Sequence, residues 1–149
     1  MGDMEKLIKK KDYQPRFRSR IYALCALYYY EVNPADKNKI IEDIKYFFPD
    51  KERVYSFFIE LFEFTIKNIE KYDTIMKRYL VNWTIERMPI VEKNIIRMAI
   101  SEFFNFDLIN PVITINEALN LSHLFCNADS SKYINGILKS VGEEFMLLD

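Results

Sequence analysis

Three arginines spaced two residues apart, Arg16, Arg18 and Arg20, have the type and spacing of a phosphate-binding group. A guanidinium donates two parallel hydrogen bonds to a phosphate, and positions 16 and 20 of a helix share a face. Two guanidiniums on that face can reach one phosphate track, whereas Arg18 points elsewhere and its role stays open. Cations at a helix start oppose the helix dipole, so stability alone is a weak reason for them. The pattern favours contact with nucleic acid.

A second candidate site lies in residues 129–138. Asp129 or Ser130 is well placed to cap a helix beginning there, with Lys132 and Tyr133 in its first turn. A cation beside an aromatic ring can hold a phosphate while the ring stacks a base. The alternative is that Tyr133 belongs to the apolar core.

Catalytic chemistry is difficult to assemble from this chain. The single histidine, His123, has no cysteine or aspartate at a spacing that activates a nucleophile, and we expect it at or near the surface. The sequence has no glycine-rich phosphate loop and no zinc-type His/Cys cluster. Cys25 and Cys126 lie far apart, which fits a reduced cytoplasmic setting. We expect a binding protein without catalytic site, metal or cofactor.

The elements that position these side chains are expected to be helices. Only three of the 149 residues are glycine, on which hairpin turns depend, and half are apolar. Five prolines divide the chain into stretches of helical length, with apolar residues at helical spacing. These stretches predict seven helices, marked by residues 16–31, 40–48, 54–69, 75–80, 95–106, 115–125 and 133–141. Gly136 falls inside the last one, where glycine costs about 1 kcal/mol relative to alanine, and close packing is its usual reason.

The expected architecture is one all-α domain of residues 15–149 after a basic extension of residues 1–14. Residues 1–20 hold seven Lys or Arg and three Asp or Glu, a net charge of +4, and the remainder holds 14 and 19, a net −5. This asymmetry is typical of nucleic-acid contact, the alternative being a solvated basic tail. The longest apolar run has ten residues, too few to span a bilayer, so no membrane association is expected.

Taken in order, these motifs resemble the NusB family of bacterial transcription antitermination factors. The resemblance runs from about Arg16 to Gly142. Its elements are the arginine-rich start, Ala26-Leu27-Tyr28 with Glu31, Asn82-Trp83, Glu86-Arg87, Val91-Glu92, Ile96-Arg97-Met98-Ala99 with Glu102, Ile115-Asn116-Glu117-Ala118, and residues 129–138.

The resemblance implies an all-helical, non-enzymatic protein that binds the boxA element of nascent RNA together with NusE, a small-subunit ribosomal protein. Such a complex helps RNA polymerase, contacted through other Nus factors, to read through terminators in ribosomal RNA operons. The family's RNA surface maps onto Arg16, Arg18, Arg20, Asp129, Lys132, Tyr133 and Asn135. Its partner surface maps onto Tyr28, Glu86 and Glu92, and the two carboxylates suit a basic protein.

Phe17 departs from the family pattern, because many relatives have a basic residue there. One phosphate contact is therefore missing or replaced by base stacking. Trp83 is expected in the core, and Asn116 and Glu117 are expected to tie their helix to its neighbours.

Two other functions fit the same pattern. NusB-like domains also assist RNA recognition in ribosomal RNA methyltransferases, although this chain leaves no room for a methyl-transfer domain. A helical dimerisation module is the third reading, supported by the aromatic run Tyr28-Tyr29-Tyr30.

Overall fold

A computed structural model describes residues 13–148. Within that range the chain forms seven α-helices and one short 3₁₀-helix and contains no strand, which confirms the all-α prediction. The helices are α2 (Pro15–Val32), α3 (Lys37–Phe47), α4 (Glu52–Lys67), α5 (Ile69–Lys77), η1 (Ile85–Arg87), α6 (Ile90–Asn105), α7 (Pro111–Phe125) and α8 (Ala128–Glu144). Most of the basic extension, including Lys9, Lys10 and Lys11, lies outside the described residues, so the division at residue 14 stays a prediction.

Prolines and asparagines set several helix boundaries. Pro15 and Pro111 occupy the first turns of α2 and α7, where proline lacks only an N–H that has no helical partner. Asn33, which precedes Pro34, ends α2. Asn127 caps α8 by accepting a hydrogen bond from the backbone N–H of Ser130 at 2.9 Å. The predicted cap at Asp129 or Ser130 was therefore wrong by two or three residues.

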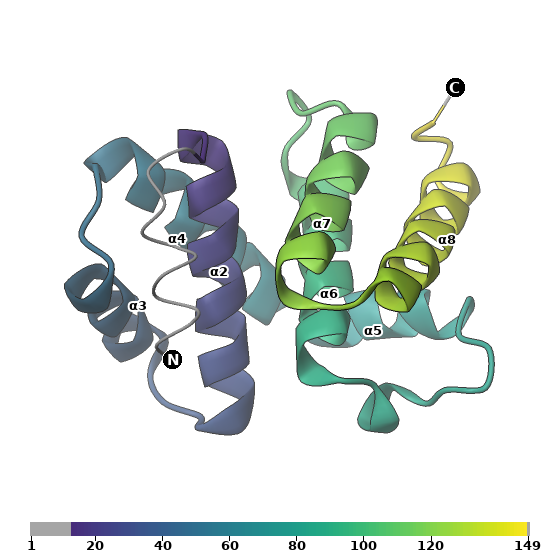
Figure 1. The fold of residues 1–149 in the computed structure, drawn as a ribbon, viewed down its shortest axis with the longest axis horizontal. Coiled ribbons are helices and arrows are strands. Elements are labelled where there is room, and N and C mark those ends of the chain that lie inside the picture. The colour runs from purple at the N-terminus through teal and green to yellow at the C-terminus, as the bar shows by residue number, and fades with distance from the viewer. Residues whose placement is uncertain (1–12, 149) are drawn as a thin grey trace.

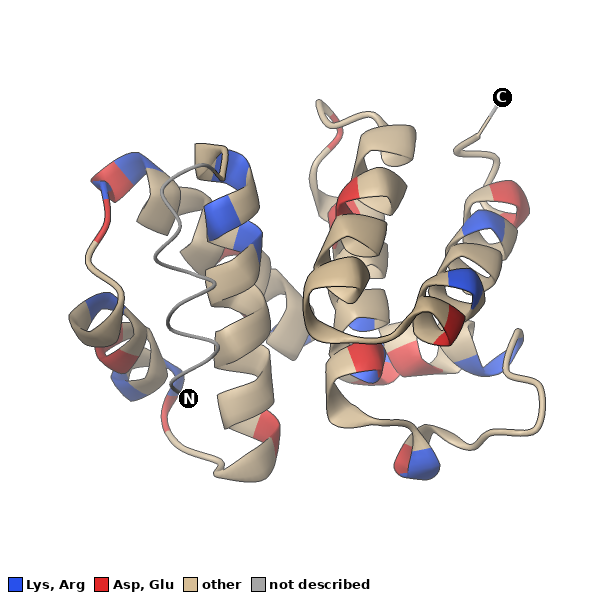
Figure 2. Ribbon diagram, in the orientation of Figure 1, with Lys and Arg blue, Asp and Glu red and all other residues tan. Residues whose placement is uncertain are grey.

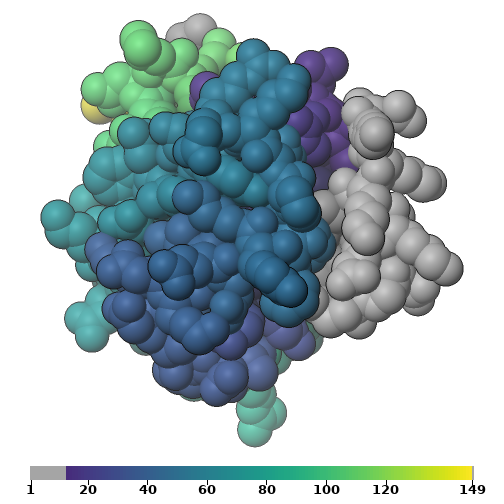
Figure 3. Space-filling model, turned by 90° about the vertical axis from the view of Figure 1, so that its left-hand side faces the viewer, coloured from purple at the N-terminus to yellow at the C-terminus, as the bar shows by residue number. Residues whose placement is uncertain are grey.

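The helices form two groups joined through α6 (Figure 1). Helices α2, α3 and α4 pack together on one side, and α7 and α8 pack against α6 on the other, with α5 beneath. Helix α6 contacts both α2 and α4, so the core is continuous between the groups and includes fully buried Leu27, Phe58, Phe62, Ile95 and Ile96. Viewed from the α3 side, α3 and α4 form most of the described surface, and the start of α2 reaches that surface at its upper edge (Figure 3).

A partly buried polar network holds α2, α5 and α6 together. Arg97 on α6 donates to both carboxylate oxygens of Asp73 at 2.7 Å and to Glu31 at 2.8 Å. Lys93 adds a second ion pair to Glu31 at 2.6 Å. Buried charges are tolerated when they are paired in this way, so these contacts fix how the three helices meet.

None of the helices in the described part of the chain combines the length and apolarity needed to cross a membrane.

Candidate nucleic-acid interface

Arg16 is the one arginine of the predicted group that is exposed. It lies in the first turn of α2, and its guanidinium stands 4.0 Å from the centroid of the Phe57 ring. Partial burial, and then the charge of the nearby Arg20, lower the pKa of Arg16. An arginine side chain stays protonated in proteins, so Arg16 presents a positioned cation at this end of the molecule (Figure 2).

Arg18 is committed to an ion pair. Its Nε and Nη2 donate to the two carboxylate oxygens of Asp50 at 2.8 and 3.0 Å, and its Nη1 donates to the Tyr13 carbonyl at 2.6 Å. The Tyr22 hydroxyl also donates to Asp50, at 2.6 Å. Burial opposes ionisation of Asp50, but the bonds from Arg18 and Tyr22 outweigh it and lower the pKa of that carboxyl to about 2. Arg18 therefore joins α2 to the α3–α4 connection.

Arg20 lies in the interior, where its side chain is 3% exposed. It donates to both oxygens of Glu102 on α6, and Glu117 on α7 lies 3.6 Å from its Nη1. The structure thus does not place Arg16 and Arg20 on one exposed face, as their spacing had suggested, because residue 20 turns toward α6. The assignment of Arg20 to RNA contact stays a prediction, which this burial disfavours.

Phe17 is also a core residue, 8% exposed, with its ring against that of Tyr13 at 5.3 Å. Of the two alternatives for Phe17, a missing phosphate contact or base stacking, this burial disfavours base stacking, because the ring faces the protein rather than solvent.

The start of α8 presents the second predicted group. Asp129 and Lys132 are exposed, and neither side chain pairs with another described residue. Tyr133 is half-buried, and its hydroxyl is buried without a hydrogen-bond partner among the described residues. Burial raises the pKa of Tyr133, so the hydroxyl stays protonated at neutral pH.

A pocket of about 490 Å³ lies between the start of α8 and the segment before α6. The residues that line it come from the predicted RNA surface, from the predicted partner surface and from the connecting loop. They are Trp83, Met88, Pro89, Glu92, Asn127, Asp129, Ser130 and Tyr133. The pocket therefore brings Glu92 together with Asp129 and Tyr133, residues that sequence reasoning had assigned to different surfaces.

Trp83 belongs to this pocket and not to the core, since 46% of it is exposed. The prediction that it packs internally was wrong, because helix α5 ends at Lys77 and residue 83 lies in the loop that follows. Asn135 lies elsewhere on α8, where it lines a groove with Asn116 of α7 and Lys139. The structure does not bring Asn135 into the pocket of Tyr133.

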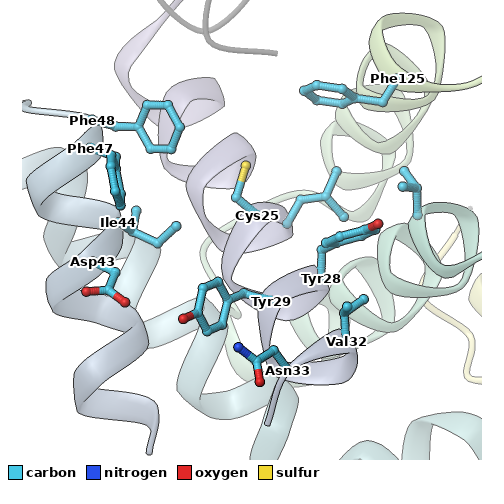
Figure 4. A pocket seen from close by; sticks show the side chains of 12 residues that line it. Cys25, Tyr28, Tyr29, Val32, Asn33, Asp43, Ile44, Phe47, Phe48 and Phe125 are labelled. Atoms are coloured by element: carbon cyan, nitrogen blue, oxygen red, sulfur yellow. The ribbon is translucent and has the colours of Figure 1, made fainter. Parts of the chain in front are cut away.

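Tyr28 reaches the surface in another groove, which is strongly apolar. The groove has a volume of about 470 Å³ and lies between α2, α3 and the end of α7 (Figure 4). Tyr28 and Val32 extend from α2, Phe47 comes from α3, and Phe125 from α7. Tyr28, Val32 and Phe47 are each about half exposed, which is a large apolar surface for a protein without a partner.

The two predicted partner-binding carboxylates lie on either side of Pro89. Glu86 is exposed on η1 and Glu92 is half-buried on α6. The thiol of Cys126 is hydrogen-bonded to Glu92, and burial together with this bond raises the pKa of Cys126 to about 12. The pKa of Glu86 lies below its usual range, and the largest cause is a hydrogen bond that its own backbone N–H donates to the carboxylate. Glu86 is therefore available as an anion to a basic partner.

The structure also tests the expectations for His123, Asn116 and Glu117. His123 is exposed, as expected. Glu117 ties α7 to α2 through its contact with Arg20, as expected. Asn116 is exposed and pairs with no described side chain, so the prediction that it ties α7 to a neighbouring helix was wrong. Among residues 13–148 no group of His, Cys, Asp and Glu side chains is arranged to hold a metal ion.

The start of α2 and the start of α8 do not form one patch. Figure 2 shows the start of α2 at the top of the α2–α4 group and the start of α8 lower down, on the other side of α7. Sequence reasoning found the chemical types correctly, but it could not find the partner of each cation. Asp50 and Glu102 lie 32 and 82 residues away from the arginines that they neutralise.

The chain is similar to known proteins in sequence and in structure. It matches the NusB family over residues 18–143. A transcription antitermination protein NusB from Desulforapulum autotrophicum is 34% identical over 128 residues, which cover 85% of this chain and 90% of the relative. Another, from Oceanobacillus iheyensis, is 33% identical over 126 residues, which cover 85% of this chain and 97% of the relative.

Solved structures share the fold. The NusB structure from T. maritima aligns with a TM-score of 0.79 at 27% identity, over 88% of this chain and 92% of that one. A chain in the crystal structure of antitermination factors NusB and NusE in complex with dsRNA aligns with a TM-score of 0.81 at 20% identity, over 87% and 97% of the two chains.

Proposed function

This chain belongs to the NusB family, and from that premise we propose that it is a transcription antitermination factor. In this proposal it is a non-enzymatic cytoplasmic adaptor that binds boxA-type single-stranded RNA together with NusE. The complex then joins elongating RNA polymerase through other Nus factors and promotes read-through in ribosomal RNA operons. Relatives at 33–34% identity carry the antitermination name, and a complex of NusB, NusE and dsRNA has the same fold, which supports the proposal.

The observation that carries the proposal is the shared pocket at the start of α8. Glu92, the expected partner contact, lines the same pocket as Asp129 and Tyr133, the expected RNA contacts. A protein bound over Glu92 would therefore lie beside RNA bound at the start of α8. Adjacent ligands can support each other directly, so each should raise the affinity for the other by the same factor.

Two exposed cations are expected to contact the phosphates of the RNA backbone. Arg16 at the start of α2 and Lys132 in the first turn of α8 have no carboxylate partner among the described residues. Phosphate contacts position a nucleic acid, whereas contacts to base edges specify its sequence. An RNA strand that touches both cations would have to cross the face between the two helix starts.

The decisive experiment is a titration of the full chain with fluorescently labelled boxA-like RNA, with and without NusE. We expect binding that tightens when NusE is present, and weaker binding of a scrambled RNA of equal length. With phosphate contacts at Arg16 and Lys132, log affinity should fall against log salt with a slope of about −1.4, at roughly 0.7 per contact on a single strand. Absence of RNA binding both with and without NusE would reject the function.

Self-association is the alternative to NusE binding at the groove around Tyr28. The exposed apolar side chains of this groove favour contact with another protein surface, either that of NusE or that of a second copy of this chain. The molar mass from light scattering, measured with and without NusE, separates the adaptor from the dimerisation module. A monomer that forms a one-to-one complex supports the adaptor, whereas a dimer that NusE cannot dissociate supports the dimerisation module.

A further inference from the structure

We propose that the pocket around Trp83 receives one unpaired base of the bound RNA, and that this base carries an exocyclic amine, as adenine, cytosine and guanine do. The base stacks on the Trp83 ring and its amine donates a hydrogen bond to the carboxylate of Asp129. The inference rests on the proposed RNA-binding function and adds a specificity site to it.

The size and lining of the pocket suit a planar ring. Its volume of about 490 Å³ lies in the range of small-molecule sites. Met88 and Pro89 form an apolar part of the lining, and Trp83 adds an indole that is 46% exposed. Trp83 pairs with no other aromatic ring of the described chain, so its stacking capacity is unused. Every base can stack on such a ring, whatever its sequence.

The carboxylate of Asp129 supplies the selectivity. It is exposed, it lines the pocket, and it pairs with no described side chain. A carboxylate repels the RNA backbone but accepts from a base amine, as Asp and Glu do from the amine of cytosine. Uracil has no exocyclic amine, and its single N3–H donor lies between two carbonyl oxygens that a carboxylate repels. The site therefore discriminates against uracil.

Tyr133 adds a polar group that the folded protein leaves unsatisfied. Its hydroxyl is buried without a partner among residues 13–148, although the residue lines the pocket. A ligand whose edge combines an amine with an acceptor would gain a bond from this hydroxyl if the ring turned toward it. Such an edge occurs on adenine, cytosine and guanine.

An indole beside a carboxylate could also suit the arginine of a protein partner, and Glu92 on the α6 side of the pocket would favour one. The start of α8, on the Asp129 side, favours RNA instead. Lys132, exposed in the same helical turn as Asp129, repels a cationic side chain and attracts a phosphate. The positive end of the α8 dipole acts in the same direction. A nucleotide meets both requirements, with its phosphate at Lys132 and its base in the pocket.

The experiment uses the fact that Trp83 is the only tryptophan of the chain. Binding of boxA-like RNA is followed by the anisotropy of a label on the RNA and, separately, by Trp83 emission and its quenching by acrylamide. We expect RNA to quench the emission and to shield Trp83 from acrylamide. Each RNA position is then replaced in turn by uracil or by an abasic site. One position should lose the emission change when abasic and should bind severalfold more weakly as uracil.

Variants of the full chain identify the contacts. W83A should weaken RNA binding about tenfold, the order expected for one stacked base, and W83F should retain most of the affinity. D129N should remove the preference against uracil at the sensitive position while leaving that of other positions unchanged. Y46A is the matched control, since Tyr46 is an aromatic side chain 79% exposed on α3, and it should change nothing.

The outcomes separate this inference from the function on which it rests. If anisotropy reports RNA binding but Trp83 emission, acrylamide access and W83A affinity are all unaffected, the base site is excluded and RNA binding stands. If an arginine-rich peptide changes Trp83 emission and RNA does not, the pocket belongs to a protein partner. If no RNA binds by anisotropy, the proposed function fails and the base site with it.

Discussion

Arg20 and Glu102 form a buried, two-bonded ion pair between the start of α2 and α6. The Arg20 Nε and Nη2 donate to the two Glu102 oxygens at 3.0 and 2.5 Å, and the two side chains are 3% and 2% exposed. Thr114 on α7 donates to the same carboxylate at 3.0 Å. Three helices therefore meet at one carboxylate, and Arg20 is a structural residue of this junction.

Replacing Arg20 with alanine should lower the free energy of unfolding by about 3–5 kcal/mol, because it leaves the Glu102 carboxylate buried without its cation. Urea unfolding followed by far-UV circular dichroism measures the change. R20K should recover only part of the loss, since an ammonium cannot donate in the planar two-bond geometry.

The control is R16A, which removes an exposed arginine one turn earlier. Its cost should stay within about 1 kcal/mol, the size of its contact with the Phe57 ring. Equal stability of the R20A and R16A variants would show that the ion pair does not hold the junction.

R16A should instead weaken RNA binding to all sequences alike. Arg16 is a cation exposed at the start of α2, so its loss should also reduce the salt slope by about 0.7. Titrations at several salt concentrations, against boxA-like and scrambled RNA, measure both effects. R53A is a suitable control, since Arg53 is an exposed arginine on α4. A loss confined to boxA-like RNA would mean that Arg16 reads a base rather than a phosphate.

Asp50 should make stability depend on pH in the acid range. Its folded-state pKa of about 2 lies below the ordinary value of 3.8, so the unfolded chain binds the proton more readily. The stabilisation is therefore complete above pH about 4 and is lost as the pH falls toward 2. D50N should lower the free energy of unfolding by about 2 kcal/mol at neutral pH, the equivalent of that shift. The melting temperature of D50N should also depend less on pH between pH 4 and 2 than that of the unchanged chain. If the two melting temperatures fell in parallel, Asp50 would not be the source of the pH dependence.

Reversal of charge at Glu92 should damage the interaction with NusE. Glu92 is half-buried at the edge of the shared pocket and its bond from the Cys126 thiol is a weak one, so E92K should fold. We expect a loss of NusE affinity of tenfold or more in calorimetry, about 1.4 kcal/mol or above. E60K, at an exposed position of α4, is the matched charge reversal and should bind NusE normally. Normal binding by E92K would take Glu92 out of the interface.

The helices could be predicted from the sequence because their causes are local. Pro15, Pro34 and Pro111 set boundaries through their own ring geometry, and apolar residues at helical spacing marked each buried face. Helix α5 was predicted from Ile75 to near Asn82-Trp83, whereas it spans Ile69–Lys77, because no proline or glycine follows it before Pro89. The cap at Asn127 was missed because Asp129 and Ser130 are equally good capping residues.

The site was predicted less completely, because exposure depends on residues distant in sequence. Nothing near Arg20 indicates that Glu102 lies beneath it, and nothing near Trp83 indicates that its ring reaches the surface. A signal did exist for the arginines, since Glu102 and Glu117 stand in largely apolar helices, where a buried carboxylate requires a partner. The chemical type of each site residue could be inferred from the sequence, whereas the burial of an individual arginine or of Trp83 could not.

Gly136 is unfavourable inside a helix, and the structure tests whether packing or the approach of a ligand explains it. It lies inside α8 and is exposed, and an added Cβ would meet nothing within 4 Å, so the expected packing reason is absent. G136A should therefore stabilise the fold by up to about 1 kcal/mol, which thermal unfolding can measure. G142A is the contrasting variant, because its Cβ would lie 2.6 Å from Leu148 and force that side chain to move. If RNA approaches the α8 backbone at residue 136, G136A should bind RNA more weakly while being more stable. Unchanged RNA affinity in the stabilised variant would place the RNA path away from this face of α8.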